Sequence, residues 1–198
     1  MKKNISIFLS LALFISCLLM SSCGSNTISG DSTEFRNADE SFSIQLPASD
    51  DKSWVINEDT SGDVLDISNK DDTVNLQIEC LSKSQAQYIA SDLDSYEDYA
   101  ITNTLSDMYS DMDVKDIEIQ TPDFITNSIS KSYTLKDGSN TVKGVFLLME
   151  SEKCYYTYLI MAIDEAYDAN EDKLMDSITS LKELSEVPAS SENETQEQ

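Results

Sequence analysis

The sequence predicts an α+β protein: a single domain with a central antiparallel sheet sandwiched by helices, in α/β/α layers. Several segments in the middle of the chain alternate apolar and polar residues at period two, which is typical of strands. The runs 145–149 and 155–163 are apolar on both faces, as expected for strands at the centre of a covered sheet. Two segments with apolar residues three and four positions apart lie on either side of these runs, and they predict the covering helices.

The strands are predicted in order along the chain. "SFSIQLP" at 41–47 alternates until Pro47, and "DTVNLQIEC" at 72–80 alternates against polar neighbours, which indicates a half-buried strand. "VKDIEIQ" at 114–120 alternates with one offset. The segment 127–163 predicts three consecutive strands, with the first turn at Asp137-Gly138 and the second at the polar residues 150–153.

Two helices complete the layers. The first is predicted over 95–112, with Ser95 and Asp98 as a capping box. The second is predicted over 171–184, with Asp168 or Asn170 as its cap. Each has one apolar stripe to bury against the sheet: Ile101, Leu105, Met108 and Met112 in the first, and Leu174, Ile178 and Leu181 in the second.

This order of segments, with Trp54 after the first strand, resembles the PsbP-like family over about residues 35–184. The similarity lies in the entry "FSIQLP", the segment "VNLQIEC", the helix opening "SYEDYAITNTL" and the exit "MDSITSLKEL". That family includes many bacterial lipoproteins. The resemblance implies a central antiparallel sheet sandwiched by helices and used mainly for binding protein partners. It transfers no functional residue to this chain.

The N-terminus predicts export and a lipid anchor. Lys2 and Lys3 precede a mostly apolar run, Ile5 to Met20, as in a signal peptide. The residues Met20-Ser21-Ser22-Cys23 then resemble the bacterial lipobox, with Met in place of the usual Leu. We expect cleavage of residues 1–22 and diacylglyceryl transfer to Cys23, with palmitate-type chains holding the protein in the bilayer. The alternative is an ordinary secretory signal whose cysteines are incidental.

The remaining organisation follows from composition. Residues 23–37 are small and polar and predict a flexible tether, 38–184 form the PsbP-like domain, and 185–198 predict a disordered acidic tail. With Cys23 acylated, we expect the domain at the outer face of a bacterial cytoplasmic membrane. The chain carries 37 acidic and 13 basic residues, so binding to nucleic acid is not expected.

Composition also argues against an enzyme. The chain has no histidine and five glycines, so the commonest general base and a glycine-rich phosphate loop are both missing. No catalytic residue or cofactor site is predicted. We expect a non-enzymatic binding module with an unknown protein partner. The alternatives are a carboxylate-only, cation-dependent hydrolase and a small solute- or sugar-binding lipoprotein.

A few further residues are candidates for specific roles. Cys80 and Cys154 form an even pair and are candidates for a disulfide in an extracytoplasmic protein, the alternative being two buried, unpaired small apolar residues. Trp54 follows a polar loop and is a candidate for an exposed contact. The acidic cluster 107–116 lacks the calcium-loop pattern, so a solvated acidic surface is expected there in preference to a metal site. Its carboxylates are Asp107, Asp111, Asp113 and Asp116.

Overall fold

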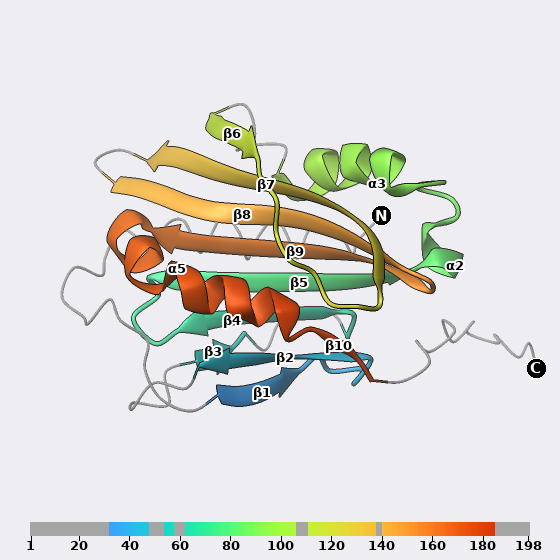
Figure 1. Cartoon of the computed structure of the whole chain (residues 1–198), viewed down its shortest axis with the longest axis horizontal. Coiled ribbons are helices and arrows are strands. Elements are labelled where there is room, and N and C mark those ends of the chain that lie inside the picture. The colour runs from blue at the N-terminus through green and yellow to red at the C-terminus, as the bar shows by residue number, and fades with distance from the viewer. Residues whose placement is uncertain (1–31, 48–53, 58–61, 106–110, 138–139, 185–198) are drawn as a thin grey trace, which may run out of the picture.

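The strands form two antiparallel sheets, shown in Figure 1. The structure is a computed structural model that describes residues 32–47, 54–57, 62–105, 111–137 and 140–184. The larger sheet has the order β3-β4-β5-β9-β8-β7-β6, and the smaller has the order β1-β2-β10. The larger consists of Trp54–Ile56 (β3), Val64–Asn69 (β4), Val74–Ser82 (β5), Met112–Asp116 (β6), Ile125–Asp137 (β7), Asn140–Ser151 (β8) and Cys154–Ile163 (β9). The smaller consists of Ser32–Arg36 (β1), Phe42–Pro47 (β2) and Lys182–Glu183 (β10).

The three strands predicted over 127–163 are confirmed as β7, β8 and β9. Strand β9 lies between β5 and β8, and its residues are buried almost throughout because both faces of the sheet are covered there. This is the reason why its sequence is apolar on both faces rather than alternating. The predicted α+β class with a large antiparallel sheet is therefore confirmed.

One face of the large sheet, which we call the α5 face, is covered by α5 (Asp164–Thr179) and the smaller sheet. Helix α5 packs against β2, β8 and β9, and Figure 1 shows it in front of the large sheet, running roughly along the strands. The segment between β6 and β7 crosses the same face and adds Ile117, Ile119 and Phe124 to its core. This core includes Phe42, Ile44, Leu46, Leu65, Ile67, Leu76, Ile78, Val145, Leu147, Tyr156, Tyr158, Ile160, Leu174 and Ile178.

The opposite face, which we call the α3 face, carries two short helices, α2 (Lys83–Ala86) and α3 (Leu93–Ala100). Helix α2 packs against β5 and β9, and α3 packs against β7, β8 and β9. A π-helical turn, Ile101–Leu105, follows α3 directly. The core on this face includes Leu81, Leu93, Tyr96, Ala100, Leu105, Tyr133, Phe146, Leu148, Tyr155, Leu159 and Met161.

The first predicted helix is shorter than expected and begins earlier. Its capping box is formed by Asp92 and Ser95, not by Ser95 and Asp98: the Asp92 carboxylate accepts from the Ser95 backbone N–H at 2.8 Å, and Ser95 Oγ accepts from the Asp92 N–H at 3.1 Å. The Met112 of the predicted stripe lies in strand β6, and Met108 lies outside the described residues.

Helix α5 also begins before its predicted start. The chain passes directly from β9 into the helix, and Ile163 occupies the cap position without a side-chain hydrogen bond. The two predicted caps make other contacts, since Asp168 pairs with Lys143 and Asn170 donates to the Ala166 carbonyl within the helix. The predicted stripe is confirmed: Leu174, Ile178 and Leu181 are all buried, although Leu181 lies just beyond the end of the helix.

Three other expectations need correction or stay open. Residues 32–36 of the predicted tether form β1, which pairs with β2, and the next residue, Asn37, is buried. Residues 117–120 of the predicted strand 114–120 form no strand in the structure. The signal peptide 1–22 and the tail 185–198 lie outside the described residues. Among the described residues, no helix combines the length and the apolar character that crossing a membrane requires.

Candidate functional site

Polar side chains line the α3 face of β4 and β5. On β5, Leu76 and Ile78 belong to the core beneath α5, so the alternating residues between and beside them face the other way. The register places Asp66 opposite Gln77 and Ser68 opposite Asn75. We call this row the polar strip; its members are Asp66, Ser68, Asn75, Gln77 and Glu79.

The half-buried pattern of residues 72–80 predicts that the polar strip is exposed to water, but in the structure the strip is buried. Four members are less than a tenth exposed, and Glu79 is partly exposed. At one end, Asp66 accepts hydrogen bonds from the amide groups of Asn75 at 2.8 Å and Asn57 at 2.9 Å. Burial raises the pKa of Asp66, and the two amide donors lower it in part. Asp66 is thus satisfied inside the fold.

Glu79, at the other end, is different. Its carboxyl group makes no hydrogen bond or ion pair within the described part of the chain. Burial, with a smaller contribution from the negative charge of Asp63, raises the pKa of Glu79 to about 7. Its neighbour across β9 is Thr157, whose hydroxyl shares a hydrogen bond of 2.9 Å with the Tyr96 hydroxyl. Glu79 is therefore a carboxyl group that can donate or accept a proton near neutral pH.

A stack of tyrosines lies beside Glu79. Tyr96 of α3 stacks on Tyr155 of β9, with ring centres 4.8 Å apart, and on Tyr99, with ring centres 6.1 Å apart. Lys83 of α2 lies 5.5 Å from the centre of the Tyr155 ring and forms an ion pair of 2.7 Å with Glu150. These contacts fix both short helices to the sheet.

The connection between the two helices presents an apolar tip to solvent. Tyr88 is 88% exposed and Ile89 is 37% exposed, although the flanking Ala86 and Ala90 are buried. We call α2, this connection and α3 together, residues 83–100, the α2–α3 corner. A rigid base with an exposed aromatic tip can serve as a contact surface for another molecule. No hydrophobic periodicity predicts this surface, because its exposed residues lie in a turn.

The predicted exposed contact at Trp54 is wrong. Trp54 is only 9% exposed, and its indole N–H donates to the Pro47 carbonyl at 2.7 Å. The side chain joins the core on the α5 face, where it lies against residues of both sheets. The next two residues of the edge strand, Val55 and Ile56, are the exposed ones, at 50% and 44%.

The structure brings the two predicted cysteines together. Cys80 on β5 and Cys154 on β9 are both buried thiols on the α5 face of neighbouring strands. The disulfide itself stays a prediction. Cys23, the predicted lipidation site, lies outside the described residues.

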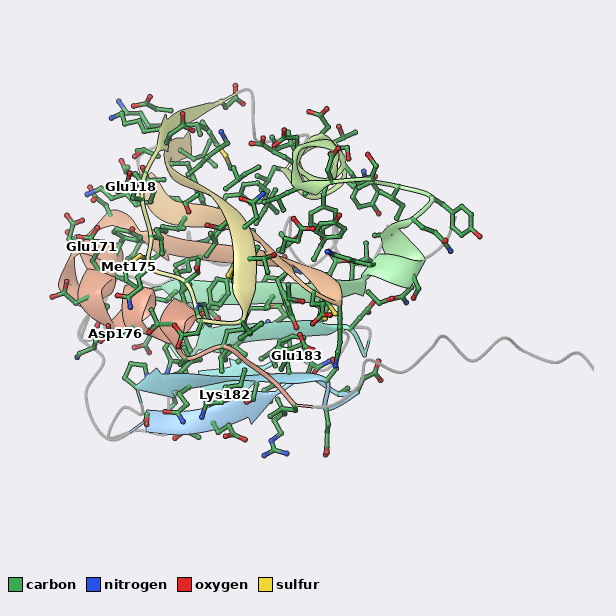
Figure 2. The ribbon with its side chains drawn as sticks, turned by 45° about the vertical axis from the view of Figure 1, so that its right-hand side comes forward. Glu118, Glu171, Met175, Asp176, Lys182 and Glu183 are labelled. Carbon is green, nitrogen blue, oxygen red and sulfur yellow. The ribbon has the colours of Figure 1, made fainter. Side chains whose placement is uncertain are left out.

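The described residues of the predicted acidic cluster face solvent. Asp111, Asp113 and Asp116 of the predicted cluster are exposed; Asp116 pairs with Lys131 at 2.9 Å, Asp113 pairs with Lys115 at 3.5 Å, and Asp107 lies outside the described residues. Figure 2 shows further carboxylates, those of Glu171 and Asp176 along α5 and of Glu118 near that helix. Among the described residues, no group of three or more His, Cys, Asp or Glu side chains is arranged to hold a metal ion.

Comparisons with known proteins give the fold. The chain is similar to cyanobacterial PsbP from Synechocystis, with a TM-score of 0.50 and 14% identity over 83% of this chain and 98% of that one. It also matches a crystal structure from Bacteroides thetaiotaomicron (TM-score 0.46, 13% identity, 77% of this chain and 48% of that one). A third match is LpqN of Mycobacterium tuberculosis, which is involved in cell envelope biogenesis (TM-score 0.41, 11% identity, 75% and 87% of the two chains).

No protein-family model and no curated protein sequence matches the chain. The match to cyanobacterial PsbP spans nearly the whole of that protein and includes the large antiparallel sheet with its few helices. The predicted resemblance is therefore confirmed at the level of the fold, which is PsbP-like.

Proposed function

We propose that this chain is a lipid-anchored extracytoplasmic protein and that it acts as a non-enzymatic interaction module, with a protein partner docking at the α2–α3 corner. The exposure of Tyr88, at 88%, is the observation that carries the docking site. Tyrosine is among the residues that most often dominate the binding energy of protein interfaces. Within the described part of the chain, Tyr88 makes no hydrogen bond or ring contact.

The base of the corner supports this role. The stacked tyrosines and the Lys83–Glu150 ion pair hold α2 and α3 in place beneath the tip. A contact that is already ordered loses less conformational entropy when a partner binds, so a fixed tip binds more tightly than a loose one.

Charge around the tip indicates the chemistry of the partner. Asp92, Asp94 and Asp98, which follow Tyr88 and Ile89 in the cap and in α3, are exposed, and the whole protein has a formal net charge of −24. We expect the partner to offer an apolar pocket for Tyr88 with basic residues at its rim. Complementary charge of this kind speeds association and excludes other acidic proteins.

The anchor rests on the sequence Met20-Ser21-Ser22-Cys23 after the apolar run. Two acyl chains on Cys23 would hold the protein stably at a bilayer, since each buried methylene contributes about 0.8 kcal/mol. The domain would then be presented outside the cytoplasmic membrane, where its partner is to be sought.

The anchor is tested by growing cells that express the protein with a labelled fatty acid. The Cys23→Ala variant should lose the label and leave the membrane fraction. Cys17→Ala is the matched control and should keep both the label and the membrane location. Loss of the label in Cys17→Ala alone would place the anchor at the other cysteine and overturn the assignment.

The docking site is tested by site-specific photo-crosslinking in intact cells. A photoreactive residue at position 88 should give a discrete crosslinked product. The same residue at position 172, an exposed aspartate of α5, is the control and should give none. The product should disappear when Ile89→Asp is added, because a charge at the tip opposes burial in an apolar pocket. Equal products at positions 88 and 172, or none at 88, would contradict the proposed surface.

A further inference from the structure

Two thiols meet in the core on the α5 face. Cys80 lies opposite Tyr156 in the β5–β9 register, and Cys154 lies opposite Ser82, so the cysteines are diagonal neighbours on adjacent strands. Both point to the same face, and their exposed fractions are 2% and 0%. Each thiol is the largest influence on the pKa of the other, as expected for neighbouring side chains.

The surroundings make the two thiols unequal. The hydrogen bond from Cys80 lowers the pKa of Cys154, whereas Cys80, as the donor and in a buried position, has a raised pKa. Nearby, Glu183 of β10 accepts from the Tyr156 hydroxyl at 3.2 Å and pairs with Lys153 at 3.4 Å. Glu183 raises the pKa of Cys154 and Lys153 lowers it, both to a smaller extent than Cys80 does. In the folded protein, Cys154 is thus the more acidic of the two thiols.

We propose that Cys80 and Cys154 are joined by a disulfide in the mature protein, and that this bond ties β5 to β9 at the centre of the large sheet. Diagonal neighbours on paired strands lie roughly 7–8 Å apart, near the upper limit for a disulfide, so the bond requires rotation of both side chains and a small shift of the strands. The inference rests on the proposed extracytoplasmic location, because thiols in the cytosol are kept reduced.

The chemistry requires an external disulfide as oxidant, either a small-molecule disulfide or a thiol–disulfide oxidase. One cysteine thiolate attacks one sulfur of that disulfide, which breaks its S–S bond and releases one thiolate as the leaving group. The other cysteine then loses its proton and attacks the mixed disulfide at the sulfur of the first cysteine, which releases the second thiolate. Two electrons and two protons pass from the protein to the oxidant, which leaves as two thiols.

Burial determines when this exchange occurs. An oxidant cannot reach sulfur atoms that are 0–2% exposed, so the bond must form before the sheet has closed around it. For the same reason, we expect the finished bond to resist reductants in the folded protein and to yield to them once the protein is unfolded.

The test begins with the full-length protein in the cells that export it. Cells are quenched with acid, free thiols are blocked with N-ethylmaleimide in denaturant so that buried thiols also react, and the unreduced protein is digested with trypsin and analysed by mass spectrometry. Cleavage after lysine gives one peptide, residues 71–83, that contains Cys80, and another, residues 154–173, that contains Cys154. We expect these two peptides to be linked, and the linked species to be absent from Cys80→Ser and from Cys154→Ser. Peptides that both carry N-ethylmaleimide would overturn the proposal.

A second arm separates a wrong geometry from a wrong location. The protein is unfolded under reducing conditions and refolded with excess glutathione disulfide. Linked peptides after refolding, together with free thiols in cells, would show that the two cysteines can form the bond but that the protein does not reach an oxidising compartment. That result would overturn the proposal. Glutathione attached to each cysteine without a linked pair would overturn the geometry. Linked peptides in both arms, with urea midpoints that fall on reduction, support the proposal.

Discussion

The two faces of the large sheet differ in what they bury. On the α5 face, strands β4, β5, β8 and β9 present an unbroken apolar surface to α5 and the smaller sheet. On the α3 face, β7, β8 and β9 are apolar beneath α3, but β4 and β5 present the polar strip. Burial of apolar area stabilises a fold, whereas burial of polar groups costs free energy unless each group finds a partner. We infer that the α5 face supplies most of the stability.

The buried polar groups on the α3 face differ in whether hydrogen bonds offset this cost. Asp66 is compensated by two amide donors, and Thr157 and Tyr96 compensate each other. Glu79 has no such partner among the described residues, and burial raises its pKa. The three predictions below test the two faces in order of expected effect.

The largest effect is expected on the α5 face. Ile178 is completely buried against the sheet, and Ile178→Ala should lower the free energy of unfolding by about 2–5 kcal/mol, through lost apolar burial and the cavity left behind. Urea unfolding followed by circular dichroism measures the change.

The matched control lies two residues away on the same helix. Asp176 is exposed, so Asp176→Ala should change the free energy of unfolding by no more than about 0.5 kcal/mol. Similar small shifts for both variants would mean that α5 does not contribute a packed layer, and the contrast between the faces would fail.

The second effect concerns Glu79 on the α3 face and depends on pH. The pKa of this carboxyl is about 7 in the folded state against its ordinary value of 4.5, so the unfolded chain releases the proton first as pH rises. The free energy of unfolding therefore decreases as pH rises from 4.5 to 7, and the whole loss of stability is present above pH 7. Glu79→Gln removes the titration and should stabilise the protein above pH 7 by up to about 3 kcal/mol, but hardly at all near pH 4.5.

Urea midpoints of the wild type and Glu79→Gln across this pH range measure the effect. Glu152→Gln removes the same charge from the exposed turn between β8 and β9, and its difference from the wild type should stay small and independent of pH. A pH-independent difference for Glu79→Gln as well would show that this carboxyl is hydrated, and the α3 face would then carry no uncompensated charge.

The sequence predicted the regular parts of the fold because their hydrophobic periodicity is strong. The meander over 127–163 and the stripe of Leu174 and Ile178 follow directly from it. Strand β4 carries a similar signal, Leu65 and Ile67 alternating with polar residues, and could have been found. Strand β1 could not, because Phe35 is its one apolar residue and it is held by backbone pairing with β2.

The candidate site was harder to predict for a different reason. The exposure of Tyr88 depends on how a turn sits on the fold, and the pKa of Glu79 depends on what surrounds it, so neither leaves a local pattern. The proximity of Cys80 and Cys154 arises from the pairing of β5 with β9, two strands far apart in the sequence. Trp54 was misplaced because the polar residues before it gave no sign that its own side chain turns inward.

The smallest of the three effects tests whether the α3 face compensates its polar groups in pairs. The hydroxyls of Tyr96 and Thr157 are buried and 2.9 Å apart. Tyr96→Phe leaves the Thr157 hydroxyl without its partner and should lower the free energy of unfolding by about 1–2 kcal/mol. The reason is that an unpaired buried hydroxyl loses its hydrogen bonds to water and gains none in the protein. Adding Thr157→Val removes that orphaned hydroxyl at nearly constant shape, so the double variant should regain most of the loss. Urea unfolding of the two single variants and the double variant completes a double-mutant cycle. Losses that simply add would mean that the two hydroxyls do not depend on each other, and Glu79 would no longer stand out as the exception on this face.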